Sequence, residues 1–189
     1  MSQRHNDDDG RVLDAARACV LDIGFRRTTL TDVARRAGVS RMTLYRRYPD
    51  LEAVFAALMT REFGRLVARA GSIADGETAR ERTVAMVVHG ARALAADPLF
   101  VRLLDVDPEL LLPYVTRRLG GMQQIAVAAG AQALSVADGS VRDDVGPEVL
   151  SAGVELIARG FVLASHGELQ AGLDPWAELA HAVDGYLRP

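Results

Sequence analysis

Lysine is absent from this sequence of 189 residues, and all 22 basic residues are arginine. The absence excludes Schiff-base chemistry and a phosphate-binding GK[ST] loop, because both need a lysine amine. A single cysteine, Cys19, excludes an intrachain disulfide and leaves too few thiolates for a cysteine-based zinc site. Only 4 isoleucines accompany 30 alanines. Since alanine favours helices and β-branched residues favour strands, the composition favours an all-helical fold.

Long apolar segments are also missing. The N-terminal sequence MSQRHNDDDG is polar and acidic and has no apolar stretch behind it, so no secretory signal is expected. The longest run without charge, Leu119 to Ala137, contains three glutamines and three glycines, which makes it too polar to span a membrane. We therefore expect a cytoplasmic protein with no membrane partner.

The net charge of −3 conceals an uneven distribution. Between Arg11 and Tyr48, nine arginines and three acids give a local charge of +6. From Pro49 to Pro189, twelve arginines and nineteen acids give −7. The acidic average therefore does not exclude nucleic acid as the partner of the basic segment.

Helix-boundary signals are frequent, and no stretch alternates between polar and apolar residues as a strand would. We expect nine or ten helices in total. Residues 1–9 are expected to form a disordered tail, residues 10–50 a three-helix unit, and residues 51–189 a helical bundle. Capping residues at Thr29, Ser40 and Thr78 and prolines at the first helical position predict helix starts, and one internal proline predicts a kink. These prolines are Pro98, Pro108, Pro147 and Pro175 at helix starts, and Pro113 at the kink.

The segment TLTDVARRAGVSRMTLYRRYPD, residues 29–50, predicts a helix-turn-helix. Ala34 is small where two helices must approach each other, Gly38 supplies the turn, and Val39 and Leu44 fill the core below. The second helix then exposes residue types that bind bases and phosphates. These are Ser40, Arg41, Thr43, Tyr45, Arg46, Arg47 and Tyr48. Each signal alone also fits a solvated arginine-rich helix, but the charge, the spacing and the caps together favour DNA binding.

Residues 11–58 resemble the DNA-binding domain of the tetracycline-repressor (TetR) family. The resemblance rests on Gly24-Phe25 before Thr28-Thr29, on the run from Asp32 to Ser40, and on Leu44-Tyr45. It implies a one-component repressor that binds a palindromic double-stranded operator DNA as a homodimer and responds to a small-molecule effector, without a cofactor. It implies base contacts from Thr31, Arg41, Met42 and Thr43, and phosphate contacts from Thr29, Tyr45 and Tyr48, with Arg46 between the last two. The family often has a phosphate-contacting lysine where this chain has Leu51, so that contact is either missing here or supplied by Arg46 or Arg47.

The segment from Pro147 to Ser165 is apolar on nearly all sides. Glu155 and Arg159 are expected to share its one exposed stripe. Such a helix is buried either inside its own chain or against a second subunit. The resemblance implies the second arrangement, with the last two helices forming the dimer interface. The interface candidates are Gly153, Leu156, Gly160, Leu163, Ala164, Trp176, Leu179, Ala180 and Val183.

An effector pocket is expected among the middle helices, mostly apolar and therefore suited to an apolar or amphipathic molecule. Arg92 and Tyr114 are the candidates for orienting polar groups. The full candidate set is Met86, His89, Arg92, Phe100, Arg102, Tyr114, Met122 and Phe161, each of which also fits a core or surface position.

No catalytic motif is visible, so we expect no enzyme. The histidines lack the spacing of metal ligands, so we expect no metal site. A helical binding protein without a DNA role would explain the acidic bundle but not the arginine-rich helix.

Overall fold

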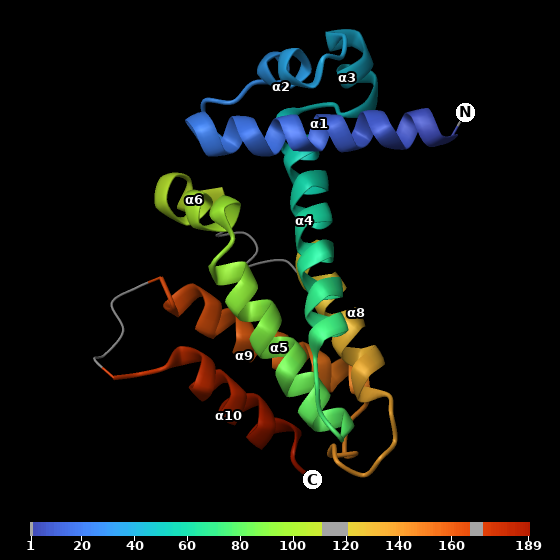
Figure 1. Cartoon of the computed structure of the whole chain (residues 1–189), viewed down its shortest axis with the longest axis vertical. Coiled ribbons are helices and arrows are strands. Elements are labelled where there is room, and N and C mark those ends of the chain that lie inside the picture. The colour runs from blue at the N-terminus through green and yellow to red at the C-terminus, as the bar shows by residue number, and fades with distance from the viewer. Residues whose placement is uncertain (1, 111–120, 167–171) are drawn as a thin grey trace. The chain divides into compact units, whose positions relative to one another are not determined.

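The computed structural model describes residues 2–110, 121–166 and 172–189, with the backbone alone for residues 2–8 (Figure 1). All regular secondary structure in these ranges is helical, which confirms the predicted fold class. The helices belong to two compact units, and each is described by itself.

The N-terminal unit comprises Met1–Glu62 and Pro98–Arg118. Its core is formed by apolar side chains that are at most 2% exposed, among them Val20, Val33, Leu44 and Leu58. Its elements are α1 (Ser2–Ile23), α2 (Leu30–Ala37), α3 (Arg41–Arg47), the first part of α4 (Leu51–Ile73), α6 (Pro98–Val106) and the 3₁₀ turn η1 (Pro108–Leu110).

A buried carboxylate joins the end of α6 to the connection between α1 and α2. Asp107 is 1% exposed and accepts the backbone N–H of Phe25 at 2.8 Å. Gly24 precedes that contact with a φ of +82°, and a Cβ there would lie 3.2 Å from Val106. Gly24, which directly follows α1, therefore also lets α6 approach closely.

The C-terminal unit comprises Phe63–Asp97 and Leu119–Pro189. In it α5 contacts the other three complete helices, and α9 packs between α8 and α10. Leu150, Val154, Leu179 and Val183 are buried there. The elements are the second part of α4, α5 (Ala79–Ala95), α8 (Gly121–Leu134), α9 (Pro147–Ala164) and α10 (Pro175–Leu187).

The structure corrects three expectations about boundaries. The tail predicted for residues 1–9 is wrong, because α1 begins at Ser2, and its residue Asp9 is bound by the side chains of Arg47 and Tyr48. The chain also divides differently from the predicted 10–50 and 51–189, because α6 packs on α1 in the N-terminal unit. Pro108 opens only a 3₁₀ turn, and the kink at Pro113 lies outside the described residues.

No single helix among the described residues is long and apolar enough to cross a membrane, although α5 and α6 counted together reach that length and composition.

Candidate nucleic-acid interface

The start of α2 is fixed by a reciprocal pair of hydrogen bonds. The Thr29 hydroxyl accepts the backbone N–H of Asp32 at 3.1 Å, and the Asp32 carboxylate accepts the backbone N–H of Thr29 at 3.1 Å. The Thr29 hydroxyl also donates to the same carboxylate at 2.6 Å, and these bonds lower the pKa of Asp32. The capping box predicted from the sequence is thus confirmed.

The turn between α2 and α3 depends on Gly38. This residue adopts the left-handed conformation, with φ 66° and ψ 32°, which glycine reaches without steric cost. The backbone N–H of Val39 then donates to the carbonyl of Ala34 at 3.1 Å, closing the end of α2. Arg11 donates from α1 to the Ala37 carbonyl at 2.6 Å, so the turn is also held from below.

The third helix begins at its cap and is anchored by one side chain. The Ser40 hydroxyl accepts the backbone N–H of Thr43 at 3.0 Å, as an N-cap residue should. Leu44 is 1% exposed and is the buried residue of α3. The opposite face of α3 is therefore presented to solvent.

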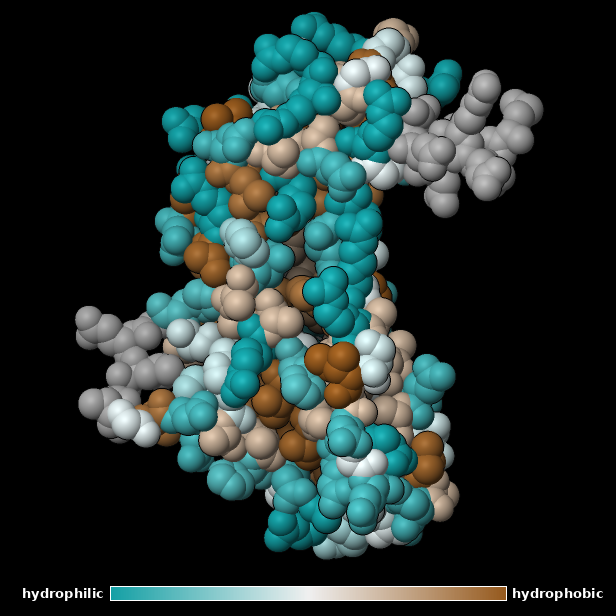
Figure 2. All heavy atoms as spheres, viewed as in Figure 1, coloured by the Kyte–Doolittle hydropathy of each residue, from teal (hydrophilic) through white to brown (hydrophobic). Residues whose placement is uncertain are grey.

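The exposed face carries the chemistry predicted for it. Met42 is 77% exposed and Tyr45 51% exposed, and Arg41 and Arg46 are exposed beside them. Neither guanidinium has a hydrogen bond or ion pair within the part of the chain that the structure describes. Hydrophilic side chains cover most of the top of the view in Figure 2, where α2 and α3 lie in Figure 1. Two cations and a phenol are therefore available to an anionic partner.

Arg47 and Tyr48, also predicted to contact DNA, differ from Arg41 and Arg46 because both bind an acid of their own chain. Arg47 pairs through Nε with Asp9 at 2.9 Å, and the Tyr48 hydroxyl donates to the same carboxylate oxygen at 3.1 Å. Burial, followed by the charge of Asp9, raises the pKa of Tyr48 to about 12. The role of Asp9 could not be predicted from the sequence, because no local pattern links position 9 to positions 47 and 48.

The hydroxyl groups predicted to contact DNA already have hydrogen-bond partners inside the chain. Thr29 bonds to Asp32, and the hydroxyls of Ser40 and Thr43 lie 2.8 Å apart and share a hydrogen bond. Thr31 is half-buried on α2. These residues shape the two helices in the free protein, and their DNA contacts stay predictions.

Comparison of the sequence and the fold with known proteins identifies the family of this chain. The pattern described as "Bacterial regulatory proteins, tetR family" matches residues 12–58. The HTH-type transcriptional regulator Rv2250c of Mycobacterium tuberculosis, itself uncharacterized, is 38% identical over 192 residues, which cover 99% of this chain and 98% of that protein. The chain belongs to the TetR family of bacterial transcriptional regulators. It is a helix-turn-helix DNA-binding protein.

Two further proteins are similar to this chain over most of its length. The HTH-type transcriptional repressor Rv1474c of M. tuberculosis is 28% identical over 182 residues, covering 92% of this chain and 88% of that one. The solved structure of the transcriptional repressor QsdR of R. erythropolis, from the TetR family, has a TM-score of 0.74 at 19% identity. That match covers 96% of this chain and 95% of QsdR, and it shows that the fold is shared.

The dimer candidates of this TetR-family chain separate into two groups. Leu179 and Val183 are both 0% exposed, so placing them at an interface is wrong: they pack inside their own chain. Gly153 is also used internally, because a Cβ there would overlap the Tyr186 side chain of α10. Leu156, Gly160 and Ala164 are exposed on α9, while the remaining candidates, Leu163, Trp176 and Ala180, are partly exposed.

The expectation that Glu155 and Arg159 share the exposed stripe of α9 is also wrong. The side chain of Glu155 is 9% exposed and that of Arg159 20% exposed, and the two lie 3.4 Å apart. The exposed stripe is apolar instead, and Val149 and Leu156 are each 59% exposed. The error arose because a helix that is apolar nearly all round gives no sequence signal for the side that faces solvent.

The pocket candidates do not gather in one unit. Phe100 and Arg102 belong to the N-terminal unit, and Tyr114 lies outside the described residues. His89 and Arg92 are exposed, and the guanidinium of Arg92 lies 5.9 Å from the ring centre of Trp176. Met86, Met122 and Phe161 are partly buried in the C-terminal unit. No group of metal-ligating side chains is found in the described ranges.

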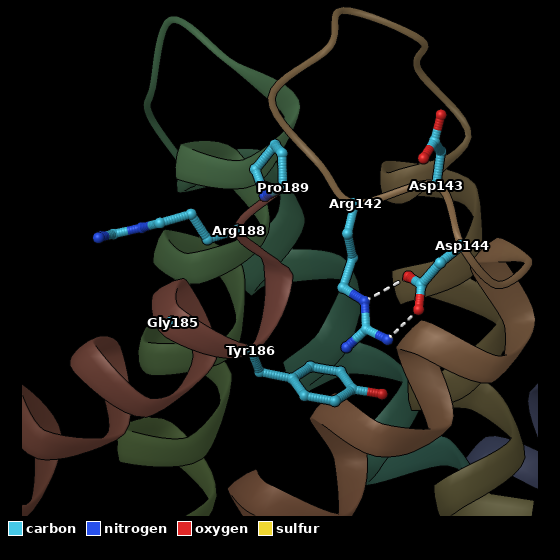
Figure 3. Close-up of a pocket in the computed structure, with 7 residues that line it drawn as sticks. All are labelled: Arg142, Asp143, Asp144, Gly185, Tyr186, Arg188 and Pro189. Atoms are coloured by element: carbon cyan, nitrogen blue, oxygen red, sulfur yellow. Dashed lines mark hydrogen bonds and ion pairs between the residues drawn. The ribbon is translucent and has the colours of Figure 1, made fainter.

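A shallow hollow lies at the end of the C-terminal unit (Figure 3). Arg142 crosses it, bound by Asp144 through two hydrogen bonds of 2.5 Å, and its guanidinium lies 5.4 Å from the ring centre of Tyr186. The other lining residues of this hollow are Asp143, Gly185, Arg188 and Pro189, so four of its seven lining residues carry a charge and none comes from the middle helices. It is therefore not the apolar pocket that the sequence predicts.

Two buried polar groups in the same unit were not foreseen. Oε1 of Gln123 is shielded from solvent and has no hydrogen-bond partner among the described residues. Oε2 of Glu155 is shielded as well, and the Arg159 guanidinium lies 3.4 Å from it. Burial raises the pKa of Glu155. Unsatisfied buried acceptors are rare in native proteins, and each one needs an explanation.

Proposed function

We propose that this TetR-family regulator is a repressor that binds a palindromic operator as a homodimer and leaves it when a small apolar or amphipathic effector binds the C-terminal unit. The observation that carries the proposal is the exposed face of α3, where Arg41 and Arg46 lie beside Met42 and Tyr45 and have no partner among the residues that the structure describes. A helix held by one buried leucine and presenting two free cations suits the major groove of DNA.

The contacts divide by chemistry. Arg41 lies in the first turn of α3, the part of a recognition helix that reaches base edges, and its fork suits the two acceptors of guanine. Arg46 lies in the last turn, where a phosphate is the nearer partner. Leu51 stands at the position of the family's lysine and Arg47 pairs with Asp9, whereas Arg46 has no ion pair within the described part of the chain.

The dimer proposal rests on the apolar stripe of α9. Val149, Leu156, Gly160 and Ala164 recur at intervals of seven, four and four residues, so they follow one side of the helix, and all four are exposed. Exposed apolar side chains in such a row favour burial against another protein surface. The small residues Gly160 and Ala164 would let a second helix approach closely. The occupant we propose is α9 of a second copy.

The effector proposal rests on Gln123 and Glu155. The Ser151 hydroxyl of α9 donates to the Val127 carbonyl of α8 at 2.8 Å, which sets the two helices in register. Gln123 lies one turn before Val127, and Glu155 lies one turn after Ser151. In Figure 1, α8 runs down the view and α9 runs back up it, so these two steps lead in the same direction. The buried oxygens of Gln123 and Glu155 therefore come to nearly the same level. An effector with an N–H or O–H group would satisfy them.

The experiment that tests the function is a gel-shift titration of the full-length protein with the DNA that flanks its own gene. The expected result is a complex that survives an excess of unrelated duplex. Binding to both DNAs with equal affinity, or to neither, would contradict the proposal. A thermal-shift screen of amphipathic compounds, followed by release of the complex, tests the effector. A matched pair of Gln123→Leu and Gln124→Leu separates the buried amide from its exposed neighbour.

A further inference from the structure

Asp9 is an acid placed within reach of the cationic turn that faces DNA in the proposed function. It lies in α1, and its Oδ1 atom binds both Nε of Arg47 and the hydroxyl of Tyr48, at 2.9 and 3.1 Å. The Arg47 side chain is only 18% exposed in this arrangement. One carboxylate thus holds two of the donors at the end of α3.

These donors are of the kinds that bind phosphate. A phosphate oxygen is an acceptor, so it takes an N–H from arginine or an O–H from tyrosine. The Tyr48 hydroxyl has one proton, and that proton is already donated to Asp9. A phosphate that takes the same proton must displace the carboxylate, and the two anions repel each other.

The rest of the exposed face of α3 has no such acid. Arg41 and Arg46 lack an ion pair among the described residues, whereas Arg47 is neutralised before any DNA arrives. Other acids of the unit bind arginines away from α3: Asp14 pairs with Arg61 of α4 at 2.8 Å. The competing charge is therefore confined to one turn of the helix.

We propose that Asp9 is an affinity-determining residue, an intramolecular competitor that occupies Arg47 and Tyr48 and is displaced by the DNA backbone. The inference rests on the proposed DNA-binding role of α3. It assigns to the start of α1 a function in setting how tightly the protein holds any DNA, independent of base sequence.

The competition has two measurable consequences. Removing the carboxylate takes one ion pair from Arg47 and the acceptor from the Tyr48 hydroxyl, so affinity should rise by about two- to fivefold, the range expected for one partly exposed ion pair. Arg47 then neutralises a phosphate that it did not neutralise before. The plot of log affinity against log salt should therefore become steeper by up to about 0.9, the value for one additional phosphate contact.

The test uses the full-length protein and a random-sequence duplex of about 30 base pairs, because phosphate contacts do not depend on sequence. Asp9→Ala is compared with Asp14→Ala, which removes the same charge from the same helix but has its partner in α4. Asp9→Asn serves as a second variant of nearly unchanged shape. Circular dichroism checks that each variant is folded.

Two results together support the proposal. Asp9→Ala and Asp9→Asn bind more tightly and with a steeper salt slope, whereas Asp14→Ala changes affinity by less than half as much. The gain from Asp9→Ala also disappears in an Arg47→Leu, Tyr48→Phe background, because neither side chain there can donate a hydrogen bond.

Other results overturn it. Weaker binding by the folded Asp9 variants would mean that the carboxylate positions α3 for DNA. Equal gains from Asp9→Ala and Asp14→Ala would mean a general charge effect. If the wild-type protein and every folded variant fail to bind duplex DNA, the proposed function itself fails, and that result differs from unchanged affinity in a protein that binds.

Discussion

Gly153 of α9 lies against Tyr186 of α10 so closely that a Cβ at position 153 would overlap the tyrosine side chain. Gly160 lies two turns further along α9, and no atom of the described residues comes within 4 Å of the corresponding position. Two glycines that look equivalent in the sequence therefore have opposite environments within the chain.

This contrast predicts opposite effects on stability. Gly153→Ala should lower the free energy of unfolding by about 1–3 kcal/mol, the usual cost of overpacking. Gly160→Ala should leave it unchanged or raise it by up to about 1 kcal/mol, because alanine is the better helix former. Urea denaturation at one fixed protein concentration measures both. Equal losses for the two variants would contradict the described packing of α9 on α10.

Gly160 also tests the proposed dimer. Gly160→Glu places a charge on the apolar stripe of α9 without a clash inside the chain, so the protein should fold but dissociate into monomers. Ala128→Glu, at an exposed position of α8 in the same unit, should stay dimeric. Light scattering at micromolar concentration measures the mass of each. A monomeric wild-type protein would refute the dimer.

The turn between α2 and α3 leads to a prediction for the stabilities of a second pair of glycine variants. Gly38→Ala forces a left-handed conformation on a residue with a Cβ and brings it to 3.0 Å from the Arg11 side chain, so it should cost about 1–2 kcal/mol. Gly10→Ala, inside α1 with open space around it, should stabilise by about 0.5–1 kcal/mol. Chemical denaturation gives both values. A neutral Gly38→Ala variant would show that the turn does not need glycine.

The ionisation of Tyr48 predicts a dependence of stability on alkaline pH. Its pKa is raised to about 12 in the folded protein, above the ordinary value of 10. The fold therefore favours the protonated phenol, and this contribution is complete below pH 10 and is lost as the pH rises from 10 to 12. Tyr48→Phe should lose less stability over that range than the wild type does.

Absorbance at 295 nm follows the same ionisation directly. In Asp9→Ala the pKa of Tyr48 should fall only part of the way to 10, because burial is the larger cause of the shift and the charge of Asp9 the smaller. A pKa of 10 in the wild-type protein would contradict the described contact.

Local signals predicted the helices well. The caps at Thr29, Ser40 and Thr78 and the turn at Gly38 are found where the sequence placed them, because capping joins residues only three or four apart. Pro98, Pro147 and Pro175 likewise open helices. Such features depend on the nearest turn and not on the rest of the fold.

Long-range contacts could not be predicted in this way. Asp9 meets Arg47 and Tyr48 across about 40 residues, and Asp107 meets the backbone of Phe25 across 82. Leu179 and Val183 form an apolar stripe whether they are buried inside the chain or against a second copy, so their periodicity did not distinguish the two. Whether the side of α9 that carries Glu155 faces solvent or the protein interior depends on the neighbouring helices, which the sequence pattern of α9 does not reveal.

The central claim is that α3 binds DNA, with Arg41 reading a base and Arg46 holding a phosphate. Measuring affinity against salt concentration for the wild type, Arg41→Ala and Arg46→Ala, on the specific site and on random duplex, tests it most directly. Arg46→Ala should weaken binding to both DNAs alike and flatten the salt slope by about one unit. Arg41→Ala should cost about 1–3 kcal/mol on the specific site only and relax one base position. Full affinity and full sequence preference in both variants would contradict the account.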